Sequence, residues 1–310
     1  MEYSFGLAPN VVAPPPVEIS FSAMGTWCHV ITHGGGPRAA EQVQAHVARL
    51  ERVWTRFNPD SELCRANESA GHWCDVSPDT RRLAGHALAG WRFSSGAFDP
   101  FVAGRMADIG YDRDFAEIDA PEPPPGRWRR APDRVPVQVD ARHERLRITP
   151  GFELDSGGIG KGLAADFAAA AALRRGVRSV LVNLGGDVRC AGRTPADGWR
   201  IALDDAWRPG TASDWSIRLR AGGVATSSAL RRSWRYSDGT EGNHLLDPRT
   251  GLPVRARYAA VSVVARHAWV AEVLTKATLL GPPAAVRGLL HRRQAAAVVT
   301  HFDGRRERLG

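Results

Sequence analysis

The sequence predicts an α+β fold in which mixed or antiparallel sheets are flanked by helices. Residues 137–140 and 145–148 alternate apolar and polar side chains on either side of a turn, which is typical of an antiparallel hairpin. Between Arg38 and Phe57, apolar residues recur at helical spacing. Strand and helix patterns follow no steady alternation and no internal repeat occurs, which disfavours a doubly wound parallel sheet.

The expected elements begin after an N-terminal arm, residues 1–18, which contains three consecutive prolines and is expected to be mobile. Residues 19–310 are expected to form a single domain. A strand pattern follows the arm and is interrupted at Gly25. This strand pattern ends at Ile31. The further elements expected in the first half are helices at 38–57 and about 79–94, a proline-rich surface excursion at 121–136, and the hairpin.

An alanine-rich helix is expected at about 161–175. It should end before Gly176, because glycine suits the left-handed conformation of a helix cap. The C-terminal part then mixes strand and helix patterns. These are strands at 178–184, 199–204, 214–220, 232–237 and 258–265, helices at about 267–280 and 283–292, and a final hairpin that turns at Asp303-Gly304.

Composition indicates a globular protein with a large core. The chain has 310 residues, of which 43% are hydrophobic and 24% charged. A chain of this size buries about 75% of its unfolded surface when it folds. No run of 18 apolar residues occurs, so no membrane span is expected.

The formal net charge is +8, and among the 41 cationic residues only Lys161 and Lys276 are lysines. The arginines are spread along the chain instead of being focused on one segment, so a nucleic-acid partner is not expected. The two lysines stand out as candidates for specific roles. The four cysteines lack metal-site spacing, and the first residues show neither the basic nor the apolar part of a signal peptide. A reduced, cytoplasmic protein is therefore expected.

The strongest chemical signal is the segment LDSGGIGKG at 154–162, directly before the alanine-rich helix. Glycines let the backbone approach a ligand closely, and a helix N-terminus offers N–H groups and partial positive charge to an anion. Lys161 adds a full charge. The spacing matches neither a Walker loop nor a dinucleotide fingerprint. The segment predicts a phosphate site, and the alternative is a tight strand–helix turn with a solvated Lys161.

A second polar segment, HLLDPRTG at 244–251, follows an expected strand. A histidine beside an aspartate can act as a general base near neutral pH, which makes His244 a candidate for that role. Alternatively, His244 is a capping or core residue and the following residues form an ordinary turn. Two glycine-containing segments, 183–187 and 223–228, would add small polar groups around an elongated ligand.

Six segments, taken in order, resemble the ApbE family, the FAD:protein FMN transferases. No single segment is diagnostic, but the order makes the match specific, and with the late helix it extends from about residue 21 to 281. The resemblance implies the T-fold-like α+β architecture of that family. The segments are AMGT (23–26), RFNPDSEL (56–63), AFDP (97–100), the glycine-rich turn, NLGGD (183–187) and HLLDPRTG.

The resemblance implies a site for FAD, the substrate. Met24 would lie against the isoalloxazine ring, a role suited to a polarizable thioether. Phe57 stands where the family often has a tyrosine. Asp155 and Lys161 would contact FAD, with Lys161 near the diphosphate. The other implied flavin-pocket residues are Ala97, Phe98, Asp99 and Leu246.

The family reaction joins FMN through its phosphate to a Thr or Ser hydroxyl of a target protein and releases AMP. The resemblance implies that His244 accepts the proton of this hydroxyl, and that Mg²⁺, held partly by the Gly158 carbonyl, neutralises charge on the diphosphate. An acceptor protein is therefore an expected partner. Two alternatives remain open: an FAD diphosphohydrolase, in which water replaces the hydroxyl, and a non-catalytic FAD-binding protein that has lost the metal.

The late helix departs from the family pattern of an Asp and, four residues later, a Thr that both bind the metal. The matching residues here are Glu272 and Lys276. Glutamate can still bind Mg²⁺, whereas an ammonium group has no lone pair to offer. We therefore expect Lys276 to point into the site, contact the FAD diphosphate and partly replace the metal or a ligand. The alternatives are a Glu272–Lys276 pair on an exposed helical face, or Thr275 as the ligand.

Overall fold

The computed structural model describes residues 15–124, 135–193, 197–204 and 212–310. Within these residues a large sheet organises the chain, and all its neighbouring strands are antiparallel. Its strands are β1 (Val17–Ala23), β2 (Thr26–Gly34), β6 (Val177–Leu184), β7 (Asp187–Gly192), β10 (Gly222–Ser228), β13 (Ala260–Ala265), β14 (Ala296–Thr300) and β15 (Arg306–Leu309), and they lie side by side in this order. The predicted α+β class with antiparallel sheets is confirmed.

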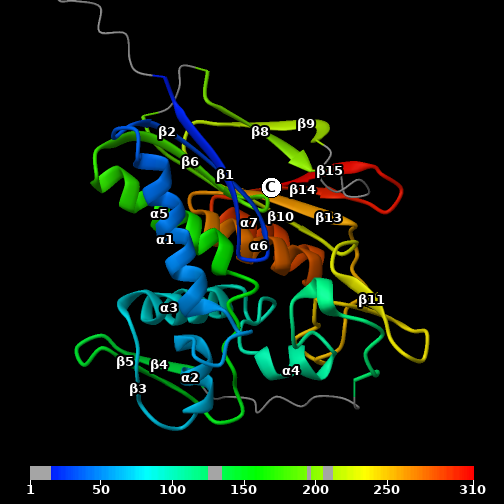
Figure 1. Cartoon of the computed structure of the whole chain (residues 1–310). Helices are drawn as coiled ribbons and strands as arrows, with labels where there is room; N and C mark the ends of the chain where they lie inside the picture. Colours follow the sequence, from blue (N-terminus) through cyan, green and yellow to red (C-terminus); the bar gives the residue numbers. More distant parts are fainter. Residues whose placement is uncertain (1–14, 125–134, 194–196, 205–211) are drawn as a thin grey trace, which may run out of the picture.

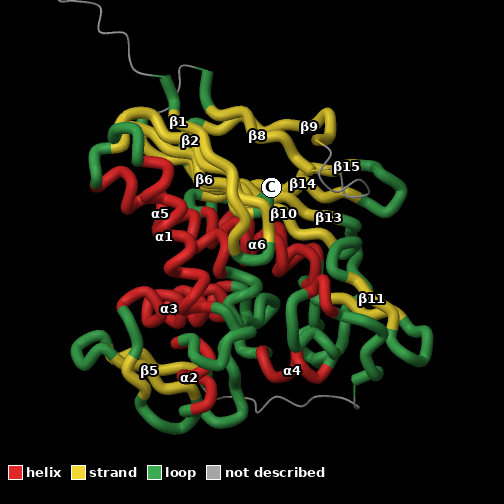
Figure 2. The backbone as a smooth tube through the Cα atoms, viewed as in Figure 1, coloured by secondary structure: helices red, strands yellow, loops and turns green. Residues whose placement is uncertain are grey.

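Helices cover one face of this sheet. They are α1 (Ala39–Trp54), α5 (Gly160–Arg174) and α6 (Ala268–Leu280), with α7 (Pro283–Arg292) packed beside α6. Figures 1 and 2 show the strands across the top of the view and these helices beneath them. The hairpin of β8 (Trp199–Asp204) and β9 (Ala212–Leu219) covers the other face, where Trp199 and Ile201 pack with Leu181 and Cys190.

The remaining elements lie on the far side of the helical layer from the sheet (Figure 1). A small sheet with strand order β3-β5-β4 is built from Cys74–Asp75, Arg145–Ile148 and Val137–Asp140, so the predicted hairpin is confirmed. The other elements there are α2 (Glu62–Glu68), α3 (Pro78–Phe93), α4 (Ala103–Asp108), a short 3₁₀ helix (Phe115–Glu117), β11 (Ser233–Arg235) and β12 (Glu241–Asn243).

Most expected helices begin or end within a few residues of the observed bounds, and Gly176 follows α5 with a φ of +88° as predicted. The short helices α2 and α4 and the strands β7 and β12 were not expected, because they are too short or too glycine-rich to show a period. Strand β1 begins at Val17, so residues 17 and 18 lie in a strand and not in the expected arm. Residues 1–14 of that arm and 125–134 of the proline-rich segment lie outside the described residues.

Two further features bear on the environment of the protein. All four cysteines are free thiols. In the part of the chain that the structure describes, every helix is too short or too polar to cross a bilayer.

Helices α5 and α6 approach each other closely at Gly162. A Cβ atom on Gly162 would lie 2.7 Å from the backbone carbonyl group of Ala268 and 2.9 Å from the backbone nitrogen of Trp269. Backbone atoms cannot move aside as a flexible side chain can, so only glycine fits here. This contact fixes where α5 begins relative to α6.

We expect Gly162→Ala to lower the free energy of unfolding by about 1–3 kcal/mol, because the added methyl group overpacks the contact between the two helices. Urea unfolding measures the change. Gly85→Ala is the matched control, since Gly85 is an exposed residue inside α3 and its added Cβ meets nothing within 4 Å. This control should gain up to about 1 kcal/mol from helix propensity. Equal effects of the two substitutions would contradict the close contact.

Candidate functional site

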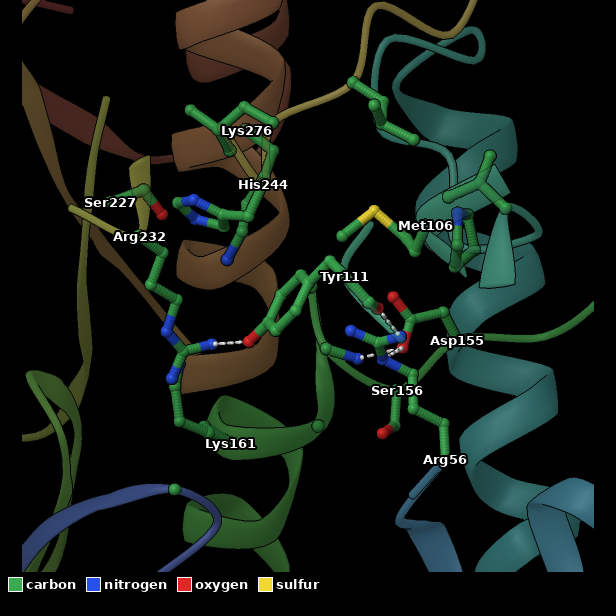
Figure 3. A pocket seen from close by; sticks show the side chains of 18 of the residues that line it. Arg56, Met106, Tyr111, Asp155, Ser156, Lys161, Ser227, Arg232, His244 and Lys276 are labelled. Carbon is green, nitrogen blue, oxygen red and sulfur yellow. Dashed lines mark hydrogen bonds and ion pairs between the residues drawn. The ribbon is translucent and has the colours of Figure 1, made fainter. Parts of the chain in front are cut away.

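A cavity of about 610 Å³ lies where the helical layer meets the smaller elements (Figure 3). Its walls come from the β1–β2 turn, the end of α1, residues 98–116, the glycine-rich turn, and residues 226–251 together with α6. Segments far apart in the sequence therefore meet around one space. Of the residues predicted from the sequence, those that line it are Met24, Phe57, Phe98, Asp99, Asp155, Gly158, Lys161, His244, Leu246 and Lys276.

One wall of the cavity combines aromatic rings with thioethers. The rings of Phe57 and Tyr111 lie 6.2 Å apart at an angle of 47°, and Met24 and Met106 line the same cavity. The Tyr111 ring also packs against Trp234, with the ring centroids 6.0 Å apart. Rings and polarizable sulfur atoms of this kind suit a flat, apolar ring system.

Arg56 connects this wall to a buried carboxylate. Its guanidinium lies 4.5 Å from the ring centroid of Phe57 and 4.4 Å from that of Tyr111. Its Nη1 donates to the Tyr111 carbonyl at 2.5 Å, and its Nε lies 3.7 Å from Oδ1 of Asp155. The same Asp155 oxygen accepts the N–H of Gly157 at 2.9 Å. Asp155 is thereby held at the entrance of the glycine-rich turn.

The glycine-rich turn presents its backbone to the cavity, which it lines with Gly157, Gly158 and Gly160. A Cβ on Gly158 would lie 2.8 Å from the ring of Phe98, so a side chain at this position would clash. Lys161 follows in the first turn of α5 and also lines the cavity. The turn thus brings backbone, a helix N-terminus and an ammonium group to one place, as a phosphate site requires.

Behind the turn, Lys161, Asp187, Glu272 and Lys276 form a charge cluster. The Lys161 ammonium contacts the Asp187 carboxylate and lies 3.3 Å from Oε1 of Glu272. The Lys276 ammonium lies 3.2 Å from the same Glu272 oxygen, and the N–H of Gly162 donates to Oε2 at 2.8 Å. Both carboxylates are buried, whereas both lysines reach the cavity. The alternative of an exposed Glu272–Lys276 pair is therefore wrong.

The cluster stabilises its own charges. Burial would raise the pKa of Glu272, but Lys161, Lys276 and the Gly162 N–H together outweigh burial and lower this pKa. Burial would likewise lower the pKa of Lys161, but Asp187 and Glu272 outweigh it and raise this pKa above its ordinary value. Glu272 and Lys161 are therefore ionised at neutral pH.

The metal site implied by the resemblance does not fit these residues. Glu272 is fully buried, and both its oxygens already accept hydrogen bonds from cationic or backbone donors. The Thr275 hydroxyl pairs with the Ser227 hydroxyl and the Glu272 carbonyl, at 2.7 Å each. Among the described residues, no group of three or more His, Cys, Asp or Glu side chains could hold a metal ion. Gly158 and Glu272, the expected ligands, thus form no suitable set of donors for Mg²⁺, which prefers carboxylate oxygens and water.

His244 reaches the cavity just after β12. Burial, followed by the positive charges of Arg232 and Lys276, lowers the pKa of His244 to about 3. Its Nδ1 atom is buried and has no hydrogen-bond partner within the described part of the chain. Figure 3 shows the ring beside Lys276 and Ser227. The imidazole is therefore neutral at physiological pH, and in the free protein it is a weak base.

Sequence reasoning missed several residues that line the cavity, namely Arg56, Met106, Tyr111 and Arg232. Arg232 donates to the Tyr111 hydroxyl at 3.1 Å and lies on the same side of the cavity as the charge cluster (Figure 3). Arg56 begins the segment RFNPDSEL but was given no role, and the other three stand in no motif, so no local signal marked them. Conversely, Ala97 does not line the cavity, because it packs against the hydrophobic cluster around α6 and β13.

Comparison with known proteins supports one family throughout. The model of the ApbE family matches residues 24–299. An FAD:protein FMN transferase of Rhodobacter capsulatus is 30% identical over 82% of this chain, which spans 49% of that relative's length. An FAD:protein FMN transferase of Treponema pallidum is 28% identical over 82% of this chain and 75% of its own.

Solved structures agree with this match. The crystal structure of the ApbE protein from Thermotoga maritima has a TM-score of 0.81 and 26% identity, with 95% of this chain and 97% of that chain covered. The flavinyl transferase ApbE of Pseudomonas stutzeri, at 24% identity, shares the fold with a TM-score of 0.74 over 97% of both chains. The family model matches most of the chain and the fold is shared with a solved ApbE protein, so this protein belongs to the ApbE family.

Proposed function

We propose that this protein transfers FMN from FAD to a Thr or Ser hydroxyl of an acceptor protein and releases AMP. The observation that carries the proposal is the composition of the cavity, which combines aromatic rings, two lysines with a helix N-terminus, and a neutral histidine beside Lys276. The relatives named FAD:protein FMN transferase support it.

The cavity offers matching surfaces to the two chemical parts of FAD. Phe57, Tyr111, Met24 and Met106 would contact the isoalloxazine ring, because flat aromatic systems bind to rings and thioethers. The glycine-rich turn and Lys161 would contact the diphosphate through backbone N–H groups and charge. These two contacts would orient FAD, with its isoalloxazine ring at the aromatic side chains and its diphosphate at the glycine-rich turn.

The reaction forms one bond and breaks one. The acceptor hydroxyl oxygen attacks the phosphorus of the FMN half, and the bond from that phosphorus to the bridging oxygen breaks, so that AMP leaves. His244 would take the proton of the hydroxyl, since its imidazole is neutral and reaches the cavity, and a bound diphosphate would raise its pKa and make it a stronger base. Positioning of the two reactants and stabilisation of phosphate charge would supply the remaining acceleration.

Mg²⁺ has no part in this proposal, because the expected donors at Gly158 and Glu272 do not fit it. The proposal includes a cytoplasmic location, with which the four free cysteines agree. The acceptor is defined only by its chemistry, as a protein that presents a Thr or Ser hydroxyl.

Mass spectrometry of a candidate flavin-binding acceptor domain, incubated with FAD and this protein, tests the proposal. We expect an acceptor that carries FMN on Thr or Ser, together with one equivalent of AMP. Free FMN and AMP formed without any acceptor would instead identify an FAD diphosphohydrolase. Binding of FAD without release of AMP would identify a non-catalytic flavin-binding protein.

We expect Lys161→Ala to weaken binding of FAD by on the order of tenfold or more while riboflavin affinity changes little, because only FAD carries the diphosphate. Calorimetric titration with both ligands measures this difference. The substitution also leaves buried Asp187 without its partner, so the double variant Lys161→Met/Asp187→Asn serves as the charge-balanced control. Equal losses for FAD and riboflavin in both variants would rule out a diphosphate contact.

We expect His244→Asn to lower the rate of FMN transfer by on the order of 10²–10⁴, because a general base is lost, while FAD affinity stays within a few fold. Single-turnover AMP release measures the rate. His29→Asn is the control, since His29 lies in β2 outside the cavity. A His244→Asn variant with full activity would show that His244 is structural.

The pKa of His244 should rise when FAD binds. In the free protein, burial and nearby cations lower it to about 3, so the imidazole stays neutral between pH 5 and 8. A bound diphosphate adds negative charge, which favours the protonated form and raises the pKa. NMR titration of the ring, assigned with His244→Asn, measures both values. The assignment of the diphosphate to this end of the cavity fails if FAD leaves the pKa unchanged or lowers it.

A further inference from the structure

We propose that the Lys276 ammonium, oriented by Glu272, takes the place of a divalent cation at the FAD diphosphate, so that binding and cleavage of FAD proceed without a metal. This inference rests on the proposed function, because it takes FAD as the ligand. It assigns the neutralisation of phosphate charge to a residue of the chain itself.

Lys276 lies next to Lys161, because both contact the same carboxylate. Glu272 is fully buried and holds two ammonium groups on one oxygen, Oε1, at 3.3 Å for Lys161 and 3.2 Å for Lys276. The two lysines come from different helices, α5 and α6, yet they converge on this atom and both line the cavity. Two ammonium groups bound to one oxygen lie close enough together to contact a single diphosphate.

The contact with Glu272 accounts for only part of what Lys276 can do. Lys161 is shared between Asp187 and Glu272, so Lys276 supplies the second positive charge for the two buried carboxylates. Lys276 adds a second desolvated cation, and its side chain is only 12% exposed. An ammonium has three donors, and one of them is directed at Glu272. Lys276 also lines the cavity, so its remaining donors can contact an anionic ligand there.

The charges around the cavity favour an anionic ligand. In the charge cluster the two lysines stand against two carboxylates, Asp187 and Glu272, whose charges they balance when all four groups are ionised. Arg232 lies nearby and makes no ion pair within the described part of the chain. A diphosphate would therefore meet two ammonium groups and a guanidinium. An additional divalent ion would face the Lys276 ammonium, and both oxygens of Glu272 already accept hydrogen bonds.

Calorimetric titration of FAD into metal-free protein, in excess EDTA and again in excess MgCl₂, tests the inference. We expect the wild type to bind FAD with the same affinity, within about twofold, under both conditions, because no metal contributes. Lys276→Met should lose on the order of tenfold or more in FAD affinity in EDTA, with riboflavin affinity unchanged. Lys276→Arg should retain part of the affinity, since it keeps the charge.

Lys276→Thr should make FAD binding dependent on a metal ion. This variant replaces the ammonium by a hydroxyl that can bind a metal, so we expect its FAD affinity to be low in EDTA and to recover in MgCl₂. Direct titration of Mg²⁺ in the presence of FAD should show tighter binding to this variant than to wild type. Urea unfolding controls for folding, because Glu272 keeps Lys161 and Gly162 as partners in every variant.

Three binding results would each overturn the inference. The wild type could bind Mg²⁺ as tightly as Lys276→Thr does, or it could lose FAD affinity in EDTA. The third is a Lys276→Met variant that binds FAD like the wild type. Failure of the proposed function is distinguishable, because it would appear as absent transfer to any acceptor while the pattern of FAD affinities stands. Transfer that occurs only with added Mg²⁺ would leave the function intact and refute the role of Lys276.

Discussion

The buried carboxylate of Glu272 is the constraint on which the site depends. A carboxylate without access to water is tolerated only when hydrogen bonds and opposite charges surround it, and removal of one partner from such a group costs several kcal/mol. Glu272 meets this requirement with the N–H of Gly162, at the start of α5, and with Lys161 and Lys276. One residue of α6 thereby determines where α5 begins and where both lysines lie.

The rest of the site follows from this arrangement. The close contact at Gly162 lets α5 start against α6, and the glycine-rich turn before it then faces the cavity. The cations collected there act on His244, because they disfavour its protonated form and keep the imidazole neutral. On the opposite wall, Arg56 holds Tyr111 and Asp155 in place through its guanidinium. Charge and aromatic surface therefore meet in one cavity, where Arg56 lies over Phe57 and Tyr111 and Arg232 donates to the Tyr111 hydroxyl.

Local sequence patterns predicted the elements whose conformation is determined by residues close together in the sequence. The hairpin at 137–148 alternates visibly, the alanine-rich helix ends at a glycine, and the glycine-rich turn precedes a helix, so each could be predicted. Tyr111 and Arg232 could not, because they reach the cavity only through the packing of distant segments. Glu272 and Lys276 were noticed in the sequence, but their burial depends on contacts between α5 and α6 that no spacing within α6 reveals.

Both cations that contact Glu272 are lysines, and the chemistry of lysine explains why. In a chain that uses arginine almost everywhere, lysine stands at both positions that contact Glu272. A guanidinium is planar and spreads its charge over a fork of donors, whereas an ammonium is a compact point charge on a flexible stem. Two ammonium groups can share a single carboxylate oxygen and still direct donors into the cavity, which two planar forks of that size cannot do in the same space. Among side chains, lysine is thus the closest equivalent of a small metal ion, and the geometry of the charge cluster depends on that property.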